Sequence, residues 1–319
     1  MSFKNIQGHA QSVGILKRYL EDSRLSGGYL FTGPEGIGKK LIALTLAKAV
    51  NCSKGKFDSC DTCVSCGKID RLDHPDVHLI ATGDDEIKIE SIRQLQRDIS
   101  FRPYEGKVKV FLIDNAHKLT ADAANCLLKI IEEPPKQSLV ILISDRPALL
   151  IRTIVSRCKT VKFSSMPRKS LEEVLSASHG LDAGMSHFLA YFSEGRLGSA
   201  LRLKDTGIVQ KKNECIDKFI LSDSGLLERS SKQERQELKQ KLGIIASWFR
   251  DMYLLKIGMP HQELINLDRK DELLRSMPKF TFGEIDDIMQ SVTDAVLYLD
   301  QNINSKLVMQ TIGAQLWKG

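Results

Sequence analysis

A glycine-rich segment between an apolar run and a helical pattern constrains the fold of this chain more than any other feature. The run Tyr29-Leu-Phe-Thr32 leads into Gly33-Pro-Glu-Gly-Ile-Gly-Lys-Lys40, and a helical pattern begins at Leu41. Such a turn lets backbone N–H groups approach phosphate oxygens at a helix N-terminus, and the lysine after the last glycine reaches the outer phosphates. The sequence therefore predicts a phosphate-binding loop with four candidate nucleotide-binding residues: Gly33, Gly36, Gly38 and Lys39.

Short apolar runs recur through the first half of the chain, with helix-length segments between them. Near-continuous apolar runs of this kind are typical of parallel strands that helices cover on both faces. We therefore predict an α/β fold with a parallel sheet, whose strands lie at Gly28–Thr32, Val77–Ile80, Val108–Ile113, Leu139–Ser144 and Thr160–Phe163.

The strand pattern ends after Phe163, and the rest of the chain follows helical periodicity. Ser170–Phe192 and Leu197–Leu203 predict a small group of helices. Further on, two apolar stripes recur at helical spacing: Leu238, Leu242, Ile245, Phe249 and Met252, then Ile285, Met289, Val292, Val296 and Leu299. We expect three domains, an α/β domain at 1–163, a small helical domain at 164–205 and an all-α domain at 206–319.

Composition and charge exclude several classes of protein. With 42% hydrophobic and 27% charged residues, the 319-residue chain is typical of a globular protein of two or three domains. No apolar run approaches the roughly 18 residues of a membrane span, and the N-terminus lacks the apolar core of a signal peptide, so we expect a cytoplasmic protein. A net charge of +6 is weaker than expected of a chain that wraps nucleic acid, and the basic residues are spread along the chain, which disfavours a DNA-binding module.

The nucleotide site departs from a hydrolysing site at two positions. The residue after Lys39 should be Ser or Thr, whose hydroxyl binds Mg²⁺, but it is Lys40. The strand that ends at Ile113 runs into Asp114, which is suited to support Mg²⁺, but Asn115 follows where a general base is needed. We therefore expect neither a Mg²⁺ site nor ATP hydrolysis in this chain alone, while ATP binding without magnesium stays open.

Four of the seven cysteines lie close together in the sequence. Cys52, followed by Cys60-x2-Cys63-x2-Cys66, offers four thiolates, which is the number that a closed tetrahedral zinc site requires. Four protein ligands leave no open position, so we predict a structural zinc and not a catalytic one. An iron–sulfur cluster is the alternative, since the same spacing begins ferredoxin patterns, although here the fourth cysteine lies upstream and no proline follows.

Several motifs spread along nearly the whole chain carry further information. They are Phe3 with Ile6-Gln-Gly8, Leu30-Phe-Thr-Gly-Pro34, the cysteine cluster ending near His74-Pro-Asp76, Ile89-Glu-Ser-Ile-Arg93, Asn125-Cys-Leu-Leu-Lys-Ile-Ile-Glu-Glu-Pro-Pro135 and Ser156-Arg-Cys158. Together these motifs resemble the bacterial clamp-loader AAA+ subunits. The resemblance implies an AAA+ α/β core with a helical lid, and a helical collar through which five subunits assemble.

The resemblance also implies a biological setting. The partners would be clamp-loader subunits of gamma/tau type and delta type in a hetero-pentamer, with the sliding clamp and primer–template DNA as indirect partners and no membrane. The chain would be a component of the DNA polymerase III holoenzyme without an enzymatic activity of its own.

Within the resemblance, Ser156-Arg157-Cys158 matches the motif whose arginine reaches the ATP held by a neighbouring subunit. Arg157 is therefore predicted to act in trans, because a guanidinium suits the charge that develops on transferred phosphoryl oxygens. Ser144 takes the place of a polar sensor residue. Gly198 stands where hydrolysing relatives present a second sensing arginine, and the nearby Arg196 lies on a different helical face.

The competing hypothesis is a subunit that hydrolyses ATP, either of gamma/tau type or another AAA+ motor. Lys40, Asn115 and Gly198 oppose that hypothesis at three separate points. The sequence therefore favours a scaffold subunit that assembles with ATPase subunits to load the clamp and donates Arg157 to a site that a partner owns.

Overall fold

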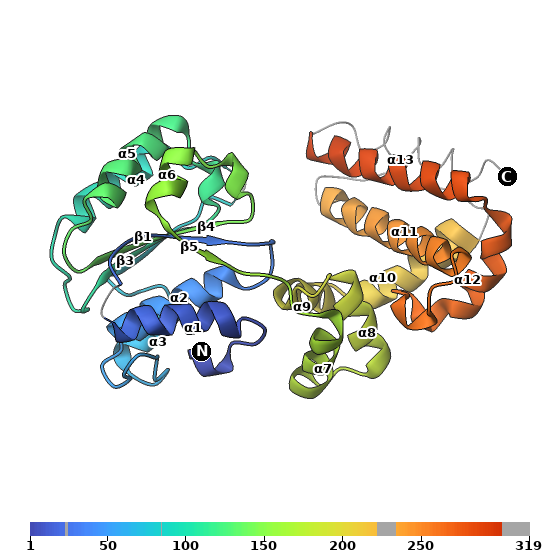
Figure 1. Cartoon of the computed structure of the whole chain (residues 1–319), viewed down its shortest axis with the longest axis horizontal. Coiled ribbons are helices and arrows are strands. Elements are labelled where there is room, and N and C mark those ends of the chain that lie inside the picture. Colours follow the sequence, from blue (N-terminus) through green and yellow to red (C-terminus); the bar gives the residue numbers. More distant parts are fainter. Residues whose placement is uncertain (23–24, 84, 222–233, 302–319) are drawn as a thin grey trace. The chain divides into compact units, whose positions relative to one another are not determined.

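The computed structural model describes residues 1–22, 25–83, 85–221 and 234–301 of the chain. The chain divides into two compact units (Figure 1). The first unit comprises Met1–Met166 and Arg196–Ser199, and the second comprises Pro167–Gly195 and Ala200–Gly319. The division into three domains stays a prediction. In the part of the chain that the structure describes, no helix has the length and apolar character needed to cross a membrane.

The first unit is built around a five-stranded parallel sheet, which confirms the predicted α/β fold. Each predicted run differs from the observed strand by at most one residue at either end. The strand order is β2-β3-β4-β1-β5, and since all strands are parallel, the carboxyl ends of β1, β3 and β4 meet at one edge. The strands are β1 (Gly27–Thr32), β2 (Val77–Ile80), β3 (Lys109–Ile113), β4 (Ser138–Ser144) and β5 (Lys159–Lys162).

Helices cover both faces of this sheet (Figure 1). Every residue of β1, β3 and β4 is buried, as expected for strands that are covered on both sides. Side chains along β1 alternate between two cores, so that Tyr29 and Phe31 join one and Leu30 joins the other. One face carries α1 (Ala10–Glu21), α2 (Lys39–Asn51) and α3 (Val64–Asp70), and the other carries α4 (Ile89–Ile99), α5 (Ala121–Glu132) and α6 (Arg152–Arg157).

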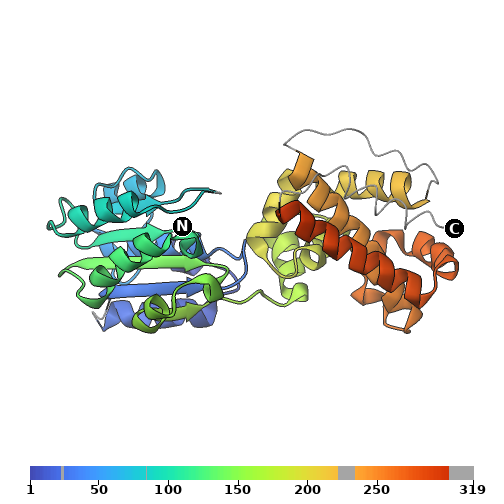
Figure 2. The same ribbon diagram turned by 90° about the horizontal axis from the view of Figure 1, so that it is seen from above.

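Helices and the loops between them make up the described residues of the second unit. Its two longest helices, α11 and α13, lie side by side (Figure 2), and Tyr253 of α11 contacts Phe282 of α13 edge-on with ring centroids 5.3 Å apart. The helices of this unit are α7 (Arg168–His179), α8 (Ala183–Phe192), α10 (Ile208–Cys215), α11 (Glu234–Lys256), α12 (Lys270–Ser276) and α13 (Phe282–Asp300), together with most of α9 (Leu197–Asp205).

The two predicted apolar stripes fall on α11 and α13. The stripe on α11 is confirmed, because all five of its side chains are buried. On α13, however, Met289 and Val296 are only half-buried, and the buried face consists of Ile285, Ile288, Val292, Ala295 and Leu299. A helix has 3.6 residues per turn, so sequence spacing alone does not decide which of two adjacent apolar residues faces the core.

Candidate functional site

The glycine-rich loop joins β1 to α2 at the carboxyl edge of the sheet. Gly33 has a φ of +147°, and a Cβ there would lie 2.2 Å from the carbonyl oxygen of Phe163, so only glycine fits. Gly38 caps α2 in the left-handed conformation with a φ of 99°. The helix therefore begins at Lys39, two residues earlier than the predicted start at Leu41. Its N-terminus lies at the edge where β3 and β4 also end.

Lys39 folds back onto its own loop. Its Nζ donates to the carbonyl oxygens of Gly33 at 2.6 Å and Pro34 at 2.7 Å, and the residue is only 7% exposed. Burial lowers the pKa of this ammonium, while nearby acidic groups, chief among them Asp145 and Asp114, raise it. A phosphate that binds in the loop must therefore draw the Lys39 ammonium away from the loop carbonyls.

Lys40, in the first turn of α2, forms an ion pair with an acidic residue at the end of β3. Its Nζ is 3.3 Å from Oδ2 of Asp114, the residue that follows β3. The two side chains are 42% and 20% exposed, so solvent weakens the pair. The ammonium still supplies positive charge beside Asp114, but a protonated amine has no lone pair with which to bind a cation. The structure thus brings the predicted Asp114 and Lys40 together.

Asn115 follows Asp114 in a left-handed backbone conformation, with φ 53° and ψ 46°. Its N–H donates to Oδ1 of Asp114 at 3.1 Å. Asparagine tolerates this region better than most residues, which gives Asn115 a local structural role. Its amide cannot accept a proton from water at neutral pH, so the position after β3 carries no general base.

The sequence pattern did not indicate two residues that share this edge, His117 and Asp145. Nδ1 of His117, on the 3-10 helix η2 (Ala116–Lys118), lies 3.3 Å from the hydroxyl oxygen of Ser144 and 3.3 Å from Oδ1 of Asp145. Burial lowers the pKa of His117, although the neighbouring Asp145 carboxylate opposes the shift. Their positions just beyond β3 and β4 are the signal that could have found them, because these strands end at the same edge.

Gly198, in the first turn of α9, contacts the glycine-rich loop directly. A Cβ at Gly198 would lie 2.6 Å from the carbonyl oxygen of Gly36, and the N–H of Ser199 donates to that same oxygen at 3.1 Å. A side chain at position 198 would therefore clash with the loop. The arrangement leaves no room for an arginine at the place where the family resemblance puts one in hydrolysing subunits.

Arg157 lies at the opposite edge of the sheet from the loop. It is the last residue of α6, and the strand that follows, β5, starts beside Tyr29 near the beginning of β1. The six residues of β1 span roughly 17–20 Å, so about that distance separates Arg157 from Gly33. The Arg157 side chain is 42% exposed, forms an ion pair with Glu132 of α5, and donates from Nη1 to the carbonyl oxygen of Thr153 at 3.3 Å. The structure does not bring Arg157 to the nucleotide site of its own chain.

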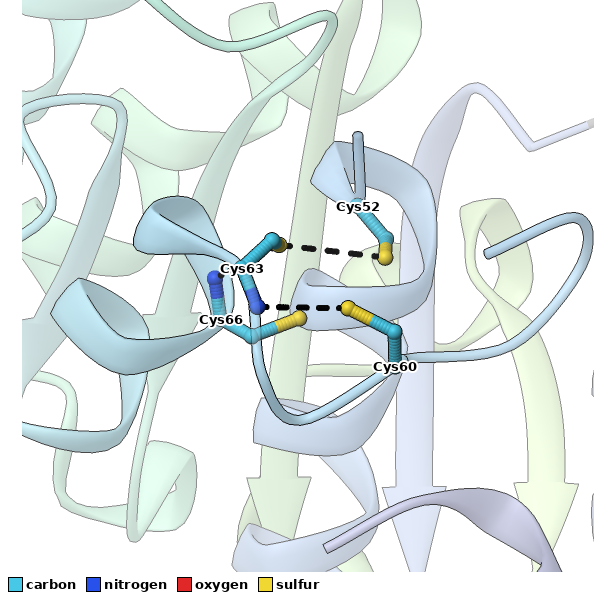
Figure 3. Close-up of side chains that lie close together, drawn as sticks. All are labelled: Cys52, Cys60, Cys63 and Cys66. Carbon is cyan, nitrogen blue, oxygen red and sulfur yellow. Dashed lines mark hydrogen bonds between the residues drawn. The ribbon is translucent and has the colours of Figure 1, made fainter. Parts of the chain in front are cut away.

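The four predicted cysteine ligands lie together beside α3 (Figure 3). Cys52 follows the last residue of α2, and Cys60 lies in the loop that leads to α3. Cys63 caps the start of α3, and Cys66 lies within it. The four sulfurs are all within 4.8 Å of one another, and those of Cys52 and Cys63 are 3.9 Å apart. With zinc–sulfur bonds of about 2.3 Å, the sulfurs of a tetrahedral site lie about 3.8 Å apart. The cluster therefore fits a single tetrahedral ion.

Backbone donors surround the sulfurs of this cluster. The N–H of Gly55 donates to Sγ of Cys52 at 3.0 Å, that of Cys63 to Cys60 at 3.3 Å, and that of Cys66 to Cys63 at 3.4 Å. Such donors stabilise the thiolate form that binds metals. An iron–sulfur cluster holds several iron atoms between its cysteines and needs wider spacing than this, so the geometry favours one ion.

Comparison with known proteins adds an independent result. Residues 8–167 match the family described as DNA polymerase III, delta subunit. The chain is 29% identical to DNA polymerase III subunit delta' of Bacillus subtilis, over 96% of this chain and 95% of that relative. It is 31% identical to DNA polymerase III subunit tau of Escherichia coli over 71% of this chain, but spans only 36% of that longer relative.

A solved structure shows the same fold. A DNA polymerase III gamma subunit-related protein from Thermotoga maritima superposes with a TM-score of 0.56 at 17% identity, covering 97% of this chain and 99% of that one. At this level of identity the likeness concerns the fold alone.

Proposed function

The chain belongs to the DNA polymerase III delta-subunit family, as a delta-prime clamp-loader subunit, and we propose that it works in its complex without hydrolysing ATP itself. In this proposal the nucleotide site of the chain does not hydrolyse ATP, and Arg157 enters the ATP site of a neighbouring subunit. Residues 206–319 form the collar that holds gamma/tau-type and delta-type subunits in a hetero-pentamer. The assembled complex then loads the sliding clamp onto primer–template DNA.

The position of Arg157 is the observation that carries this proposal. An arginine that stabilises a transferred phosphoryl group must touch its oxygens. Arg157 lies about a strand length from Gly33, at the opposite edge of the sheet, so it cannot serve the nucleotide site of its own chain. A partly exposed guanidinium at that edge is accessible to a second protein, which supports action in trans.

The chain's own nucleotide site supports the silent role. Lys40 pairs with Asp114 in place of a metal ion, and Asn115 provides no base. The backbone contact between Gly198 and Gly36 leaves no room for a sensing arginine. Three separate parts of a hydrolysing site are therefore absent, and this counts against the competing ATPase hypothesis.

We further propose that the cysteine cluster holds one structural zinc. Four sulfur ligands close the coordination sphere, which leaves no position for a water or a substrate. The ion would join the end of α2 to the start of α3 and so shape the surface of the first unit.

Replacing Arg157 with alanine tests the proposed function. We expect Arg157→Ala to leave assembly intact and to lower turnover at the one ATP site that it serves by about a thousandfold or more. Since other sites in the complex keep their own arginines, the measurement is single-turnover ATP hydrolysis by the reconstituted complex in the presence of clamp and primed DNA. The fast amplitude should fall by one ATP per complex.

Arg152 supplies a matched control, because it is an exposed arginine on the same helix α6. Arg152→Ala should keep the full fast amplitude. If Arg157→Ala also keeps it, while gel filtration shows an intact complex, the trans role of Arg157 is wrong.

A further inference from the structure

We propose that Glu132 is a positioning residue that sets the orientation of the Arg157 guanidinium and thereby the turnover at the ATP site that Arg157 serves. This inference rests on the proposed function above. Glu132 itself contacts neither nucleotide nor phosphate in this role, since it acts only through Arg157.

The contacts of Arg157 fix its guanidinium at two points. Glu132 forms an ion pair with Nε, and the carbonyl oxygen of Thr153 accepts a hydrogen bond from Nη1 at 3.3 Å. Two anchors on a planar group define both its direction and its rotation. The other amino group, Nη2, has no hydrogen-bond acceptor among the described residues, so it is left to meet an incoming phosphoryl oxygen.

Buried neighbours of the two residues fix where the pair lies. Ile131 precedes Glu132 and Cys158 follows Arg157, and both are buried against the same point of β1. A Cβ added to Gly28 would lie 2.9 Å from Cγ2 of Ile131 and 3.2 Å from Sγ of Cys158. Because Gly28 has no side chain, the ends of α5 and α6 approach the same strand closely, and this packing places the two residues of the ion pair beside each other.

The location of Glu132 is otherwise hard to explain by local helix preferences. It is the last residue of α5, and a carboxylate at a helix C-terminus faces the negative end of the helix dipole. The Arg157 cation removes this conflict. The pair is half-exposed, at 42% and 45%, so its contribution to stability is small. Orientation of the arginine is therefore the main effect that the pair can have.

A pre-oriented guanidinium raises turnover and has little effect on ATP binding. An arginine that is free in solvent must give up side-chain rotation when it meets the transferred phosphoryl group, and a misdirected one forms poorer hydrogen bonds there. Because Nε and Nη1 are already held, the side chain has given up part of its rotational freedom before the neighbour's ATP binds. The effect should therefore fall on kcat, with KM for ATP nearly unchanged.

The test compares Glu132→Gln with Glu133→Gln in the fully reconstituted complex. Glutamine keeps the length of Glu132 and removes its charge. Glu133 is the adjacent exposed carboxylate and forms no ion pair within the described part of the chain. We expect Glu132→Gln to lower kcat at the served site by about two- to fivefold, the range that an exposed ion pair supports. KM for ATP, assembly and the Glu133→Gln control should stay unchanged.

The double variant separates positioning from a merely structural role. In an Arg157→Ala background, Glu132→Gln should have no further effect, because there is no guanidinium left to orient. An equal drop in that background, or an unchanged or faster turnover in Glu132→Gln alone, would overturn the inference. A failure of the proposed function is seen separately, as an Arg157→Ala complex that keeps its fast amplitude.

Discussion

Lys40 places an ammonium 3.3 Å from the carboxylate of Asp114, at the position where a hydrolysing site has a hydroxyl that binds Mg²⁺. A fixed positive charge can neutralise Asp114 as an ion would, yet it cannot polarise a phosphoryl oxygen by coordination. On the proposed function, Lys40 therefore balances the charge of Asp114 without supplying the coordination that a metal ion would give.

Restoring the hydroxyl should restore magnesium dependence. For the isolated chain we expect ATP binding that is absent or indifferent to Mg²⁺, whereas Lys40→Thr should bind ATP about tenfold or more tightly when Mg²⁺ is added. Calorimetric titration with and without Mg²⁺ measures this directly. The Lys40→Thr chain should still not hydrolyse ATP, because Asn115 remains.

Lys40→Ala is the matched control for this experiment, since it removes the ammonium without adding a ligand for the ion. Its response to Mg²⁺ should be weaker than that of Lys40→Thr. If the unmodified chain already binds ATP more tightly with Mg²⁺ than without, the role assigned to Lys40 is wrong.

Some site residues could be predicted from the sequence and others could not. The glycines at 33, 36 and 38, with Lys39, Lys40 and the four cysteines, belong to short motifs in which spacing along the chain determines proximity, and Asp114 is recognisable because it follows an apolar strand. His117, Asp145 and Glu132 acquire their partners only through the packing of separate strands and helices. Strand order decides those contacts, and the sequence pattern does not contain it.

At the level of secondary structure elements, the cysteine cluster replaces the usual helix caps. Cys52 caps the end of α2, and Cys63 caps the start of α3 by accepting the N–H of Cys66. The helix α3 has only seven residues, and a helix of that length is marginal without tertiary support. A bound ion between the two helices would provide this support.

Removing one ligand should therefore release the ion and destabilise the first unit. We expect the unmodified chain to hold one zinc, and Cys66→Ala to lose it together with about 3 kcal/mol or more of unfolding free energy. Atomic absorption gives the zinc content, and urea unfolding gives the free energy. Cys126→Ala is the control, because Cys126 is half-buried and outside the cluster. Equal zinc content in the two variants would exclude this cluster as the metal site.

The strands were easier to predict than the helical faces, for a physical reason. The strands β1 and β4 are buried on both sides, so they appear in the sequence as continuous apolar runs with sharp ends. On α13, Ile288 and Met289 are adjacent apolar residues, and only packing against α11 selects Ile288 for the core. Sequence periodicity thus locates a helix well but leaves its rotation uncertain by one residue.

For the whole molecule, the two compact units have separate cores. Leu142 of β4 is fully buried in the sheet core, and Leu242 of α11 is fully buried in the helical unit. Units of this size that carry their own cores commonly unfold as separate cooperative transitions. The composition, 42% hydrophobic over 319 residues, allows two such cores, but it does not show how the residues divide between them.

Calorimetric unfolding of the isolated chain should therefore show two transitions that respond to different substitutions. Leu142→Ala removes a fully buried side chain from the first unit and should cost it about 3 kcal/mol, lowering one Tm by about 6–12 °C. Leu242→Ala is the matched change in the second unit and should lower the other Tm by a similar amount. Each variant serves as the control for the other. If either variant shifts both transitions equally, or if a single transition accounts for all the heat, then the two units unfold as one cooperative body and this prediction is wrong.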